Sequence, residues 1–449
     1  MNMFANHHFK HQIPLPRAKA GLCGELHVRA KVDELECGSI SATVQPEDFD
    51  NIVSSLQPAK TVEVKKRKAC PAHDSKLWSD LKHPRISIRK ILSRILLFVL
   101  SILYILSPPW PPLMMRKAIF CPPPRGSYYY LIGYQKNGKK KACFYAHEAI
   151  GMERVAICLP QMLHPKIRAV DVYYHLLRCK TIILPFNETQ YFCAMELSCE
   201  QSIRWLHRDK SRTIKRSPYL IIFSQPNSSD LGCCLMMDPN FADMADFLQC
   251  DMLIYDYPGY GVSDGESTEK NIYVCSEAVF KYATDKLGYA PENIILMGFS
   301  LGTAAMIHIA EMQKVGAVVL IAPFTSFSRI LLRCPSMATP IFDMFPSLEK
   351  SEKITSPTLI CHGQRDIIVS HAHGVQLQKK IPNSELYSLK HASHQGIFCE
   401  REMWDEVERF LGHRVQITAK WSELLQKESA FSEITEVAVE PVFVPSKTD

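Results

Sequence analysis

Short apolar runs recur along the C-terminal half of this chain, and stretches with helical periodicity separate them. Each run has the length of a buried strand. The strands predicted in this way cover residues 219–223, 252–255, 294–297, 317–321, 358–361 and 386–389, and a final helix covers residues 402–411. Strands that alternate with helices predict an α/β fold, with a mostly parallel sheet, helices on both faces and right-handed crossovers. In such a sheet a functional site lies at the carboxyl ends of the strands.

The same pattern divides the 449 residues into regions. Residues 1–84 lack sustained periodicity and mix charged with small polar residues, which is typical of a disordered region. Residues 217–412 contain the predicted sheet and form the catalytic core, and residues 413–449 form a C-terminal extension. Residues 118–216 are the least regular part. We expect leading strands and an insertion there, with strand candidates at 154–159 and 181–184, and one helical pattern in the extension at 421–428.

A short membrane-associated segment is predicted at residues 85–117, ahead of the core. Its residues 95–115 are 21 consecutive uncharged residues, of which 95–106 are free of proline. A spanning helix needs about 20 apolar residues, and the prolines that follow Leu106 cut this one short. Basic residues flank it on both sides, namely Arg85, Arg89, Lys90, Arg94, Arg116 and Lys117. This arrangement favours a shallow or re-entrant insertion with both ends on the cytoplasmic side, and a buried core helix is the alternative.

A candidate nucleophile follows the strand predicted at residues 294–297. The sequence Gly-Phe-Ser-Leu-Gly at 298–302 connects this strand to a helical run that begins at Thr303. A G-x-S-x-G motif between a strand and a helix is typical of a nucleophile elbow, in which the glycines allow a sharp turn that exposes the serine hydroxyl. Ser300 is therefore the predicted nucleophile. The alternative is a serine that only caps the helix.

The same five-residue pattern occurs a second time, at residues 261–265. Its serine, Ser263, follows a stretch in which Pro258, Gly259 and Gly261 indicate an open loop and not a strand. We therefore assign Ser263 to a loop or to the start of a helix.

A serine hydroxyl needs a base to remove its proton and a carboxylate to orient that base. In α/β hydrolases these groups follow the serine in the order acid, then histidine. Asp366 follows the predicted strand 358–361, and His391 and His394 follow the strand 386–389. Asp366 is therefore the predicted acid, and the spacing leaves both histidines open as the base.

The remaining histidines near Asp366 and the cysteines of the chain give no indication of a metal site. His371 and His373 lie close behind Asp366 at the start of a predicted helix, where we expect them at the surface. No carboxylate or cysteine completes a recognisable ligand set near the His391 and His394 pair. The 16 cysteines are dispersed and contain no C-x-x-C pair, which favours reduced cytosolic thiols over a disulfide framework. We expect no cofactor.

The charge of the chain is modest, at +6, and uneven. Positive charge concentrates at residues 65–68 and around the apolar segment, where anionic lipid would attract it. No basic face interleaved with aromatic residues and no nucleic-acid motif is present, so no nucleic-acid partner is expected.

Several motifs in the core give a family resemblance. They are Tyr-Asp-Tyr-Pro-Gly-Tyr-Gly at 255–261, the elbow at 298–302, Phe-Asp-Met-Phe-Pro at 342–346, Glu-Lys at 349–350, Lys-Ile-Thr-Ser-Pro at 353–357 and His-Gly-Gln-Arg-Asp at 362–366. In this order they resemble the α/β-hydrolase domain-containing protein 17 family, over about residues 217–411, with a weaker echo at 118–123. The resemblance implies an α/β-hydrolase fold. It also places Ser300, Asp366 and His394, not His391, at the nucleophile, acid and base positions.

The chain departs from the pattern of that family in two places. The family has histidine and glycine in the loop after the third strand, where this chain has Gln225 and Pro226. This loop supplies one N–H group of the oxyanion hole, which we expect from the backbone of Asn227, with the second from the backbone of Leu301. The family also carries an N-terminal cluster of cysteines that are palmitoylated, whereas here the N-terminal cysteines are scattered.

The resemblance implies a membrane-attached serine hydrolase that removes palmitate from the cysteines of peripheral membrane proteins. The expected partners are S-acylated membrane proteins, or acyl lipids, and the membrane surface. We expect the catalytic domain to face the cytoplasm, at the plasma membrane or at endosomal membranes. Two alternatives stay open: a lipid esterase or lysophospholipase, and a catalytically weakened membrane scaffold, which the residues Gln225 and Pro226 suggest.

Overall fold

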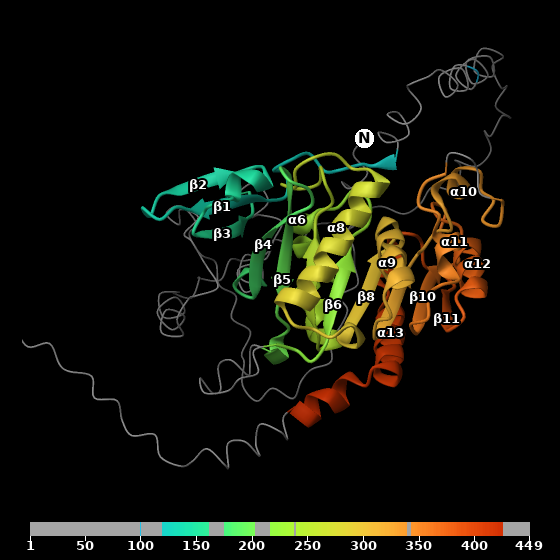
Figure 1. Ribbon diagram of the computed structural model, residues 1–449. Helices are drawn as coiled ribbons and strands as arrows, with labels where there is room; N and C mark the ends of the chain where they lie inside the picture. Colours follow the sequence, from blue (N-terminus) through green and yellow to red (C-terminus); the bar gives the residue numbers. More distant parts are fainter. Residues whose placement is uncertain are drawn as a thin grey trace, which may run out of the picture. The chain divides into compact units, whose positions relative to one another are not determined.

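The computed structural model describes residues 119–160, 175–202, 216–237, 239–338 and 343–424, together with Val99. The predicted disordered region 1–84 lies outside the described residues, and so does the predicted membrane segment 85–117 except for Val99. From Phe120 onward the described residues form one α/β unit (Figure 1). Among the residues that the structure describes, no helix has the length and apolar character needed to cross a membrane.

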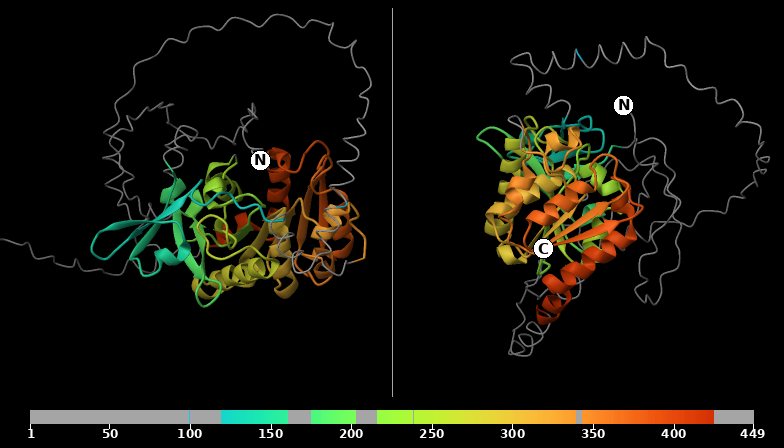
Figure 2. Two further views of the ribbon diagram at one scale, coloured as in Figure 1. Left: turned by 90° about the horizontal axis from the view of Figure 1, so that it is seen from above. Right: turned by 90° about the vertical axis from the view of Figure 1, so that its right-hand side faces the viewer.

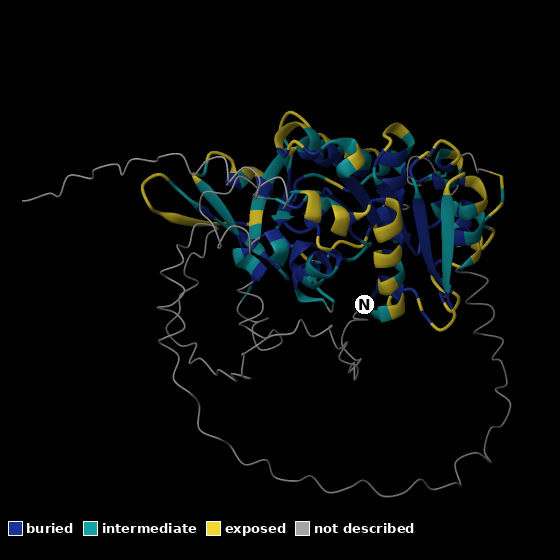
Figure 3. Ribbon diagram, turned by 90° about the horizontal axis from the view of Figure 1, so that it is seen from below, coloured by how far each residue is buried: buried dark blue, intermediate teal, exposed yellow. Residues whose placement is uncertain are grey.

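An eight-stranded sheet with the order β11-β10-β9-β8-β6-β7-β5-β4 is the centre of this unit. The strands from β6 to β11 pair in parallel, as the sequence pattern predicts. Their bounds are β6 (Leu220–Ser224), β7 (Asp251–Tyr255), β8 (Ile294–Phe299), β9 (Ala317–Ile321), β10 (Thr358–Gly363) and β11 (Ser384–Leu389). Every residue of β6 to β10 is buried, because helices cover both faces of a parallel sheet (Figure 3). The prediction of an α/β-hydrolase fold with a mostly parallel sheet is confirmed.

Helices lie on both faces of the sheet, with α8 and α9 on one face and α13 on the other (Figures 1 and 2). The helices α6, α7 and α13 share one apolar cluster with alternate residues of the strands, such as Phe223 and Met297. The longer helices are α7 (Phe241–Leu248), α8 (Glu269–Lys281), α9 (Leu301–Met312), α12 (Ala372–Lys380) and α13 (Arg401–Arg414). The shorter helices are α6 (Leu231–Met236), α10 (Phe327–Leu331), α11 (Ser347–Ser351), the 3-10 helices η1 (Ala146–Ala149), η4 (Pro291–Asn293) and η5 (Gly396–Cys399), and the π-helix η3 (Tyr282–Lys286).

The chain before the parallel strands adds antiparallel structure. The strands β4 (Cys179–Pro185) and β5 (Tyr191–Leu197) form a hairpin that extends the large sheet beyond β7. A separate sheet of order β2-β1-β3 contains β1 (Tyr130–Tyr134), β2 (Lys140–Cys143) and β3 (Arg154–Cys158). The two strand candidates of this region, 154–159 and 181–184, correspond to β3 and β4. Strand β2 is missing from the prediction because its first three residues, Lys-Lys-Ala, are exposed and carry no apolar pattern.

The C-terminal part ends in two helical stretches. The predicted helix at 402–411 is the centre of α13. Residues 417–424 are also helical, so a helix begins a few residues before the predicted 421–428, of which 425–428 lie outside the described residues. Trp421 holds this stretch against the core, because its side chain is buried and its Nε1 donates to the carbonyl of Gln249 at 3.0 Å.

Candidate active site

Ser300 occupies a sharp turn between β8 and α9. Its backbone has φ 52° and ψ −115°, a conformation that non-glycine residues rarely adopt. The turn is held by the Ser300 N–H, which donates to the carbonyl of Ile321 on β9 at 2.9 Å, and by Thr303, whose hydroxyl donates to the Ser300 carbonyl at 2.6 Å. Such a conformation costs about 1–3 kcal/mol and persists only where the surrounding structure enforces it.

The two glycines of the motif explain how the turn is packed. A Cβ atom on Gly302 would lie 1.9 Å from the carbonyl oxygen of Ser224, at the end of β6. A Cβ atom on Gly298 would lie 2.6 Å from the carbonyl oxygen of Gly302 itself. Both distances are far below van der Waals contact, so any side chain at either position would push α9 away from the sheet. The close approach keeps Ser300 partly accessible at the carboxyl edge of the sheet.

Ser300, His394 and Asp366 form one chain of hydrogen bonds. The Nε2 atom of His394 lies 2.9 Å from Ser300 Oγ, and its Nδ1 atom lies 2.6 Å from Asp366 Oδ2. Since a carboxylate only accepts, this contact places the proton on Nδ1 and leaves Nε2 free to accept from the serine. The spacing left His391 and His394 open as the base. The structure brings His394 to the serine, whereas His391 is exposed.

The carboxylate of Asp366 is buried and held from several sides. Its Oδ1 atom accepts from the backbone N–H groups of Ile368 and Val369, at 2.9 and 2.7 Å. Burial alone would raise the pKa of Asp366, but the neighbouring His362 imidazole and the hydrogen bonds from His394 and Val369 reverse this effect and hold the pKa well below its usual value. Asp366 therefore stays ionised and can orient His394 at any physiological pH.

His362 is a second histidine beside the acid, and the sequence analysis did not assign it a role. Its ring is buried, with Nε2 at 2.9 Å from the carbonyl of Val369 and at 3.6 Å from Asp366 Oδ2. The signal for it was present in the sequence, because His362 directly follows the predicted strand 358–361 and lies four residues before Asp366. A histidine near the end of a buried strand and next to an acid is placed to shape the acid loop.

The prediction that His373 lies at the surface is wrong. The residue is 1% exposed, and its Nδ1 atom lies 2.8 Å from the hydroxyl of Thr325. It lies on the face of α12 that packs against the chain after β9. The polar and apolar residues of α12 are not clearly separated in the sequence, so the pattern did not show which face is buried. His371 is partly exposed at the start of the same helix and contacts Ser388 Oγ at 2.7 Å. Within the described residues, neither histidine forms a hydrogen bond with Ser300 or His394, and burial lowers the pKa of both.

The two expected oxyanion donors follow two neighbouring strands, β6 and β8, at this edge. Leu301 is the first residue of α9, where backbone N–H groups have no partner within the helix. Asn227 lies in the turn after β6, which pairs with β8. The side chain of Asn227 fixes this turn, because its Oδ1 atom accepts from the Tyr260 hydroxyl at 2.5 Å and from the backbone N–H of Cys121 at 3.0 Å.

The residues Gln225 and Pro226, which depart from the family pattern, belong to the same loop. The Gln225 side chain is fully buried and points away from the loop surface, with Nε2 donating to Asp256 Oδ1 at 2.7 Å. Asp256 also accepts from the Tyr129 hydroxyl and from the Leu231 N–H. Burial, and secondly the charge of the neighbouring Asp230, raise the pKa of Asp256 to about 8. A buried hydrogen-bond network thus holds the loop from beneath.

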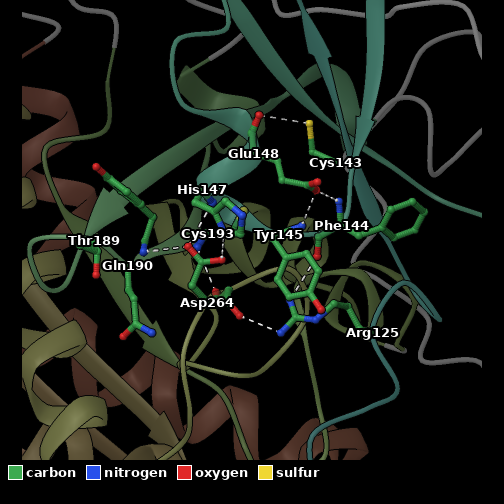
Figure 4. Close-up of polar contacts among 12 residues, drawn as sticks. Arg125, Cys143, Phe144, Tyr145, His147, Glu148, Thr189, Gln190, Cys193 and Asp264 are labelled. Carbon is green, nitrogen blue, oxygen red and sulfur yellow. Dashed lines mark hydrogen bonds and ion pairs between the residues drawn. The ribbon is translucent and has the colours of Figure 1, made fainter.

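The serine of the second G-x-S-x-G pattern, Ser263, stabilises the loop through hydrogen bonds to the backbone. Ser263 is fully buried, and its Oγ atom accepts from the Cys193 N–H at 3.0 Å. The next residue, Asp264, accepts from the backbone N–H of His147 at 3.1 Å, and its carboxylate lies 2.8 Å from the His147 ring (Figure 4). The Arg125 guanidinium donates to the Ser263 carbonyl at 3.0 Å. This loop therefore joins the small sheet to the large one and does not expose its serine.

The family models that match the chain agree with this arrangement. A model described as "Serine hydrolase" matches residues 282–413, the range that contains Ser300, Asp366 and His394. A second model, described as "Chlamydia CHLPS protein (DUF818)", matches residues 215–318. The fold and these matches define the chain as an α/β serine hydrolase.

Curated relatives confirm the resemblance to the α/β-hydrolase domain-containing protein 17 family. The chain is 34% identical over 200 residues to α/β hydrolase domain-containing protein 17C of Xenopus tropicalis, which covers 44% of this chain and 63% of the relative. It is 33% identical over 205 residues to human protein 17C, covering 45% and 61%, and 37% identical over 166 residues to human protein 17B, covering 37% and 56%. The matches therefore span less than two thirds of these relatives.

Solved structures with a similar fold include the Pyrococcus furiosus esterase Pf2001 and α/β hydrolase domain-containing protein 10 from mouse. The first is 17% identical, with a TM-score of 0.42, and the match covers 53% of this chain and 92% of the esterase. The second is 18% identical, with a TM-score of 0.37, and the match covers 53% and 98%.

Proposed function

We propose that this protein is a membrane-attached acyl-protein thioesterase that removes fatty acyl groups from cysteines. The observation that carries the proposal is the continuous hydrogen-bonded chain from Ser300 Oγ through His394 to Asp366, at distances of 2.9 and 2.6 Å. A serine in a strained elbow, next to a histidine that an ionised carboxylate orients, is the arrangement that activates a hydroxyl for acyl transfer. In this proposal Ser300 is the nucleophile, His394 the base and Asp366 the acid.

The first half of the proposed reaction forms an acyl-enzyme. Ser300 Oγ attacks the carbonyl carbon of the thioester while His394 Nε2 takes the serine proton. Asp366 stabilises the imidazolium that results. The backbone N–H groups of Leu301 and Asn227 stabilise the negative oxygen of the tetrahedral intermediate. The intermediate collapses by breaking the C–S bond, and His394 returns the proton to the leaving thiolate.

The second half of the reaction regenerates the serine. Water enters, His394 takes one of its protons, and the hydroxide attacks the acyl carbon of the ester on Ser300. Collapse of the second tetrahedral intermediate breaks the bond between the acyl carbon and Ser300 Oγ, and His394 returns the proton to that oxygen. The products are a fatty acid and the free enzyme, with no cofactor required.

The proposals of a thioester substrate and of membrane attachment are supported by observations other than the triad. The similarity to the α/β-hydrolase domain-containing protein 17 family supports S-acylated membrane proteins as the substrates. The apolar residues 95–115 and their basic flanks support attachment to a membrane with the catalytic unit on the cytoplasmic side. The same triad would also cleave an oxygen ester, so a lipid esterase differs from the proposed enzyme only in the substrate that it accepts.

Labelling with a fluorophosphonate probe tests the proposed chemistry directly, because the probe reacts only with an activated serine. We expect labelling of the purified protein and its loss in Ser300→Ala, with Ser263→Ala as the control that keeps it. Comparison of a palmitoylated peptide with a lysophospholipid as substrates then separates the thioesterase from the lipid esterase.

The scaffold alternative predicts the opposite result. If the natural protein shows no labelling, the double change Gln225→His with Pro226→Gly restores the family residues in the oxyanion loop. Labelling that appears only in this double variant would mean that the natural loop is impaired. No labelling in either protein would contradict the enzyme and favour a membrane scaffold.

A further inference from the structure

Two pairs of large aliphatic side chains are exposed at the edge of the sheet where Ser300 lies. Leu331 ends the short helix α10 and is followed by Leu332, and these side chains are 65% and 60% exposed. Ile367 and Ile368 directly follow Asp366 and are 89% and 53% exposed. We call these four residues the apolar rim. Water contact with large aliphatic groups is unfavourable, so such a cluster marks a surface that another phase or molecule covers.

Strand order places both pairs on the same edge as the nucleophile. Helix α10 follows β9, and the loop with Ile367 follows β10, and these two strands are parallel neighbours. Strand β8, which ends at Phe299 directly before Ser300, is the other neighbour of β9. The Thr325 N–H and hydroxyl, just before α10, contact His373 Nδ1 on α12 at 3.3 and 2.8 Å. The α10 stretch is therefore attached to the helix that follows the acid loop.

Cations without an acidic partner accompany the apolar rim. Arg333, Arg365 and Lys390 are exposed, and within the described part of the chain none of their side chains forms an ion pair or hydrogen bond. The Arg365 N–H donates to the Ala392 carbonyl at 3.1 Å, which places Arg365 beside the loop that contains Lys390. In residues 323–338, 363–371 and 389–396 the only acid is Asp366, whose carboxylate is buried. We call these three cations the basic flank.

We propose that the apolar rim and the basic flank form a docking surface for an anionic lipid bilayer, independent of residues 85–117. The aliphatic side chains would enter the boundary between headgroups and acyl chains, and the cations would contact anionic headgroups. A bilayer fits better than a protein groove, because the aliphatic pairs stand on separate loops and are surrounded by free positive charge. The inference rests on the proposed membrane attachment and adds the face that meets the lipid.

Docking by this surface has a consequence for the proposed reaction. The rim lies on the loops after β9 and β10, the two strands between those that lead to Ser300 and to His394, so its insertion would turn the opening of the site toward the headgroups. An acyl chain attached to a cysteine lies at this depth. The surface would therefore present the thioester carbonyl to Ser300 without full extraction of the acyl chain into water.

Depth-dependent quenching of tryptophan by brominated lipid tests the surface in the full-length protein. The variant Ile367→Trp places a probe on the rim at the most exposed position. The matched control is Met312→Trp, because Met312 is 48% exposed but lies at the C-terminal end of α9, far along the helix from Ser300. Vesicles contain phosphatidylserine and brominated phosphatidylcholine, and each variant is compared with the parent protein to subtract the natural tryptophans.

We expect extra quenching in Ile367→Trp and none in Met312→Trp. Adding Arg365→Gln and Lys390→Gln to the rim probe should reduce that quenching, since each cation strengthens binding to an anionic surface about fivefold. Protein that sediments with vesicles but shows equal quenching at both probes would overturn the docking surface alone. Protein that does not sediment with vesicles at all would overturn both the surface and the proposed membrane attachment.

Discussion

The imidazole of His394 lies 2.9 Å from the hydroxyl of Ser300, although the two residues are 94 positions apart in the chain. The contact spans two intervening strands of the sheet. Ser300 follows β8, His394 follows β11, and β9 and β10 lie between those strands. The loop after β10 fills the gap with Asp366, which contacts the far nitrogen of the same imidazole. Three separate loops are thus brought to one point by the parallel arrangement of their strands.

Replacement of Ser300 by alanine should remove nearly all hydrolysis of a short acyl thioester. Loss of a nucleophile of this type lowers turnover about a millionfold, because the base has no hydroxyl to activate. Ser263→Ala should retain most of the activity, since that side chain is buried and contacts only backbone. Turnover of purified proteins with equal melting temperatures checks the comparison, and similar losses in both variants would exclude Ser300 as the nucleophile.

Gly302→Ala should disrupt the elbow. Its Cβ atom would lie 1.9 Å from the Ser224 carbonyl oxygen, so the start of α9 has to move and Ser300 moves with it. We expect a loss of activity of at least about a hundredfold, together with lower stability. Gly412→Ala is the matched control at an exposed position of α13, where nothing lies within 4 Å of the new methyl group. It should raise the free energy of unfolding by about 0.5–1 kcal/mol. Equal behaviour of the two variants in thermal melts and assays would refute the packing argument.

Tyr260→Phe should slow the chemical step. The lost hydroxyl donates to Asn227 Oδ1, so the turn that holds the Asn227 N–H loses a restraint. A displaced oxyanion donor should lower kcat between about tenfold and a hundredfold with little change in KM. Tyr289→Phe removes the hydroxyl of another buried tyrosine, which donates to the Ser217 carbonyl at 3.0 Å, outside the site. If both variants lower kcat to the same extent, Tyr260 has no positioning role.

The free energy of unfolding should fall as the pH rises from about 4 to about 8. Burial raises the pKa of Asp230 from 3.8 to about 6, and burial with the Asp230 charge raises that of Asp256 to about 8. In this window the folded chain keeps protons that the unfolded chain has released, so rising pH favours unfolding. Asp230→Asn should flatten the decline, because it removes one charge while asparagine still caps α6. Melting temperatures of both proteins across the window provide the measurement, and parallel curves would contradict the prediction.

Deletion of residues 85–117 should release most of the protein from membranes at moderate salt and leave hydrolysis of a soluble acyl ester intact. The described catalytic sheet uses none of these residues in its strands, whereas the apolar run with basic flanks suits a bilayer. Fractionation followed by an esterase assay on each fraction measures both effects. Full retention of the deleted protein in the membrane pellet would show that the segment is not the anchor.

Much of the fold was predictable because it depends on local pattern. Parallel strands covered on both faces are continuously apolar, so β6 to β10 can be recognised in the sequence. The two glycines of residues 298–302 indicate a sharp turn in which the backbone packs too closely to leave room for a side chain. Strands with a mixed pattern escaped prediction, since β1 and β2 are stabilised by pairing with each other and with β3. Asp366 could also be predicted as the acid. It follows a predicted strand, and it lies between the serine and the histidines in the chain, which is the order that α/β hydrolases use.

Residue types and spacing could not separate neighbours that look alike in sequence, whereas the tertiary structure separates them directly. Residue types and spacing by themselves left His391 and His394 equivalent, and the structure shows one exposed and the other turned toward Ser300. His373 reads as a surface residue until the packing of α12 buries it. In the sequence Gln225 is only a departure from the family pattern, and the structure adds that its side chain is buried and donates to Asp256. The sequence by itself determined the strands, the elbow and the order of the candidate residues, because backbone conformation and burial leave a local pattern. Side-chain direction was decided only by contacts between segments far apart in the chain, which no local pattern encodes.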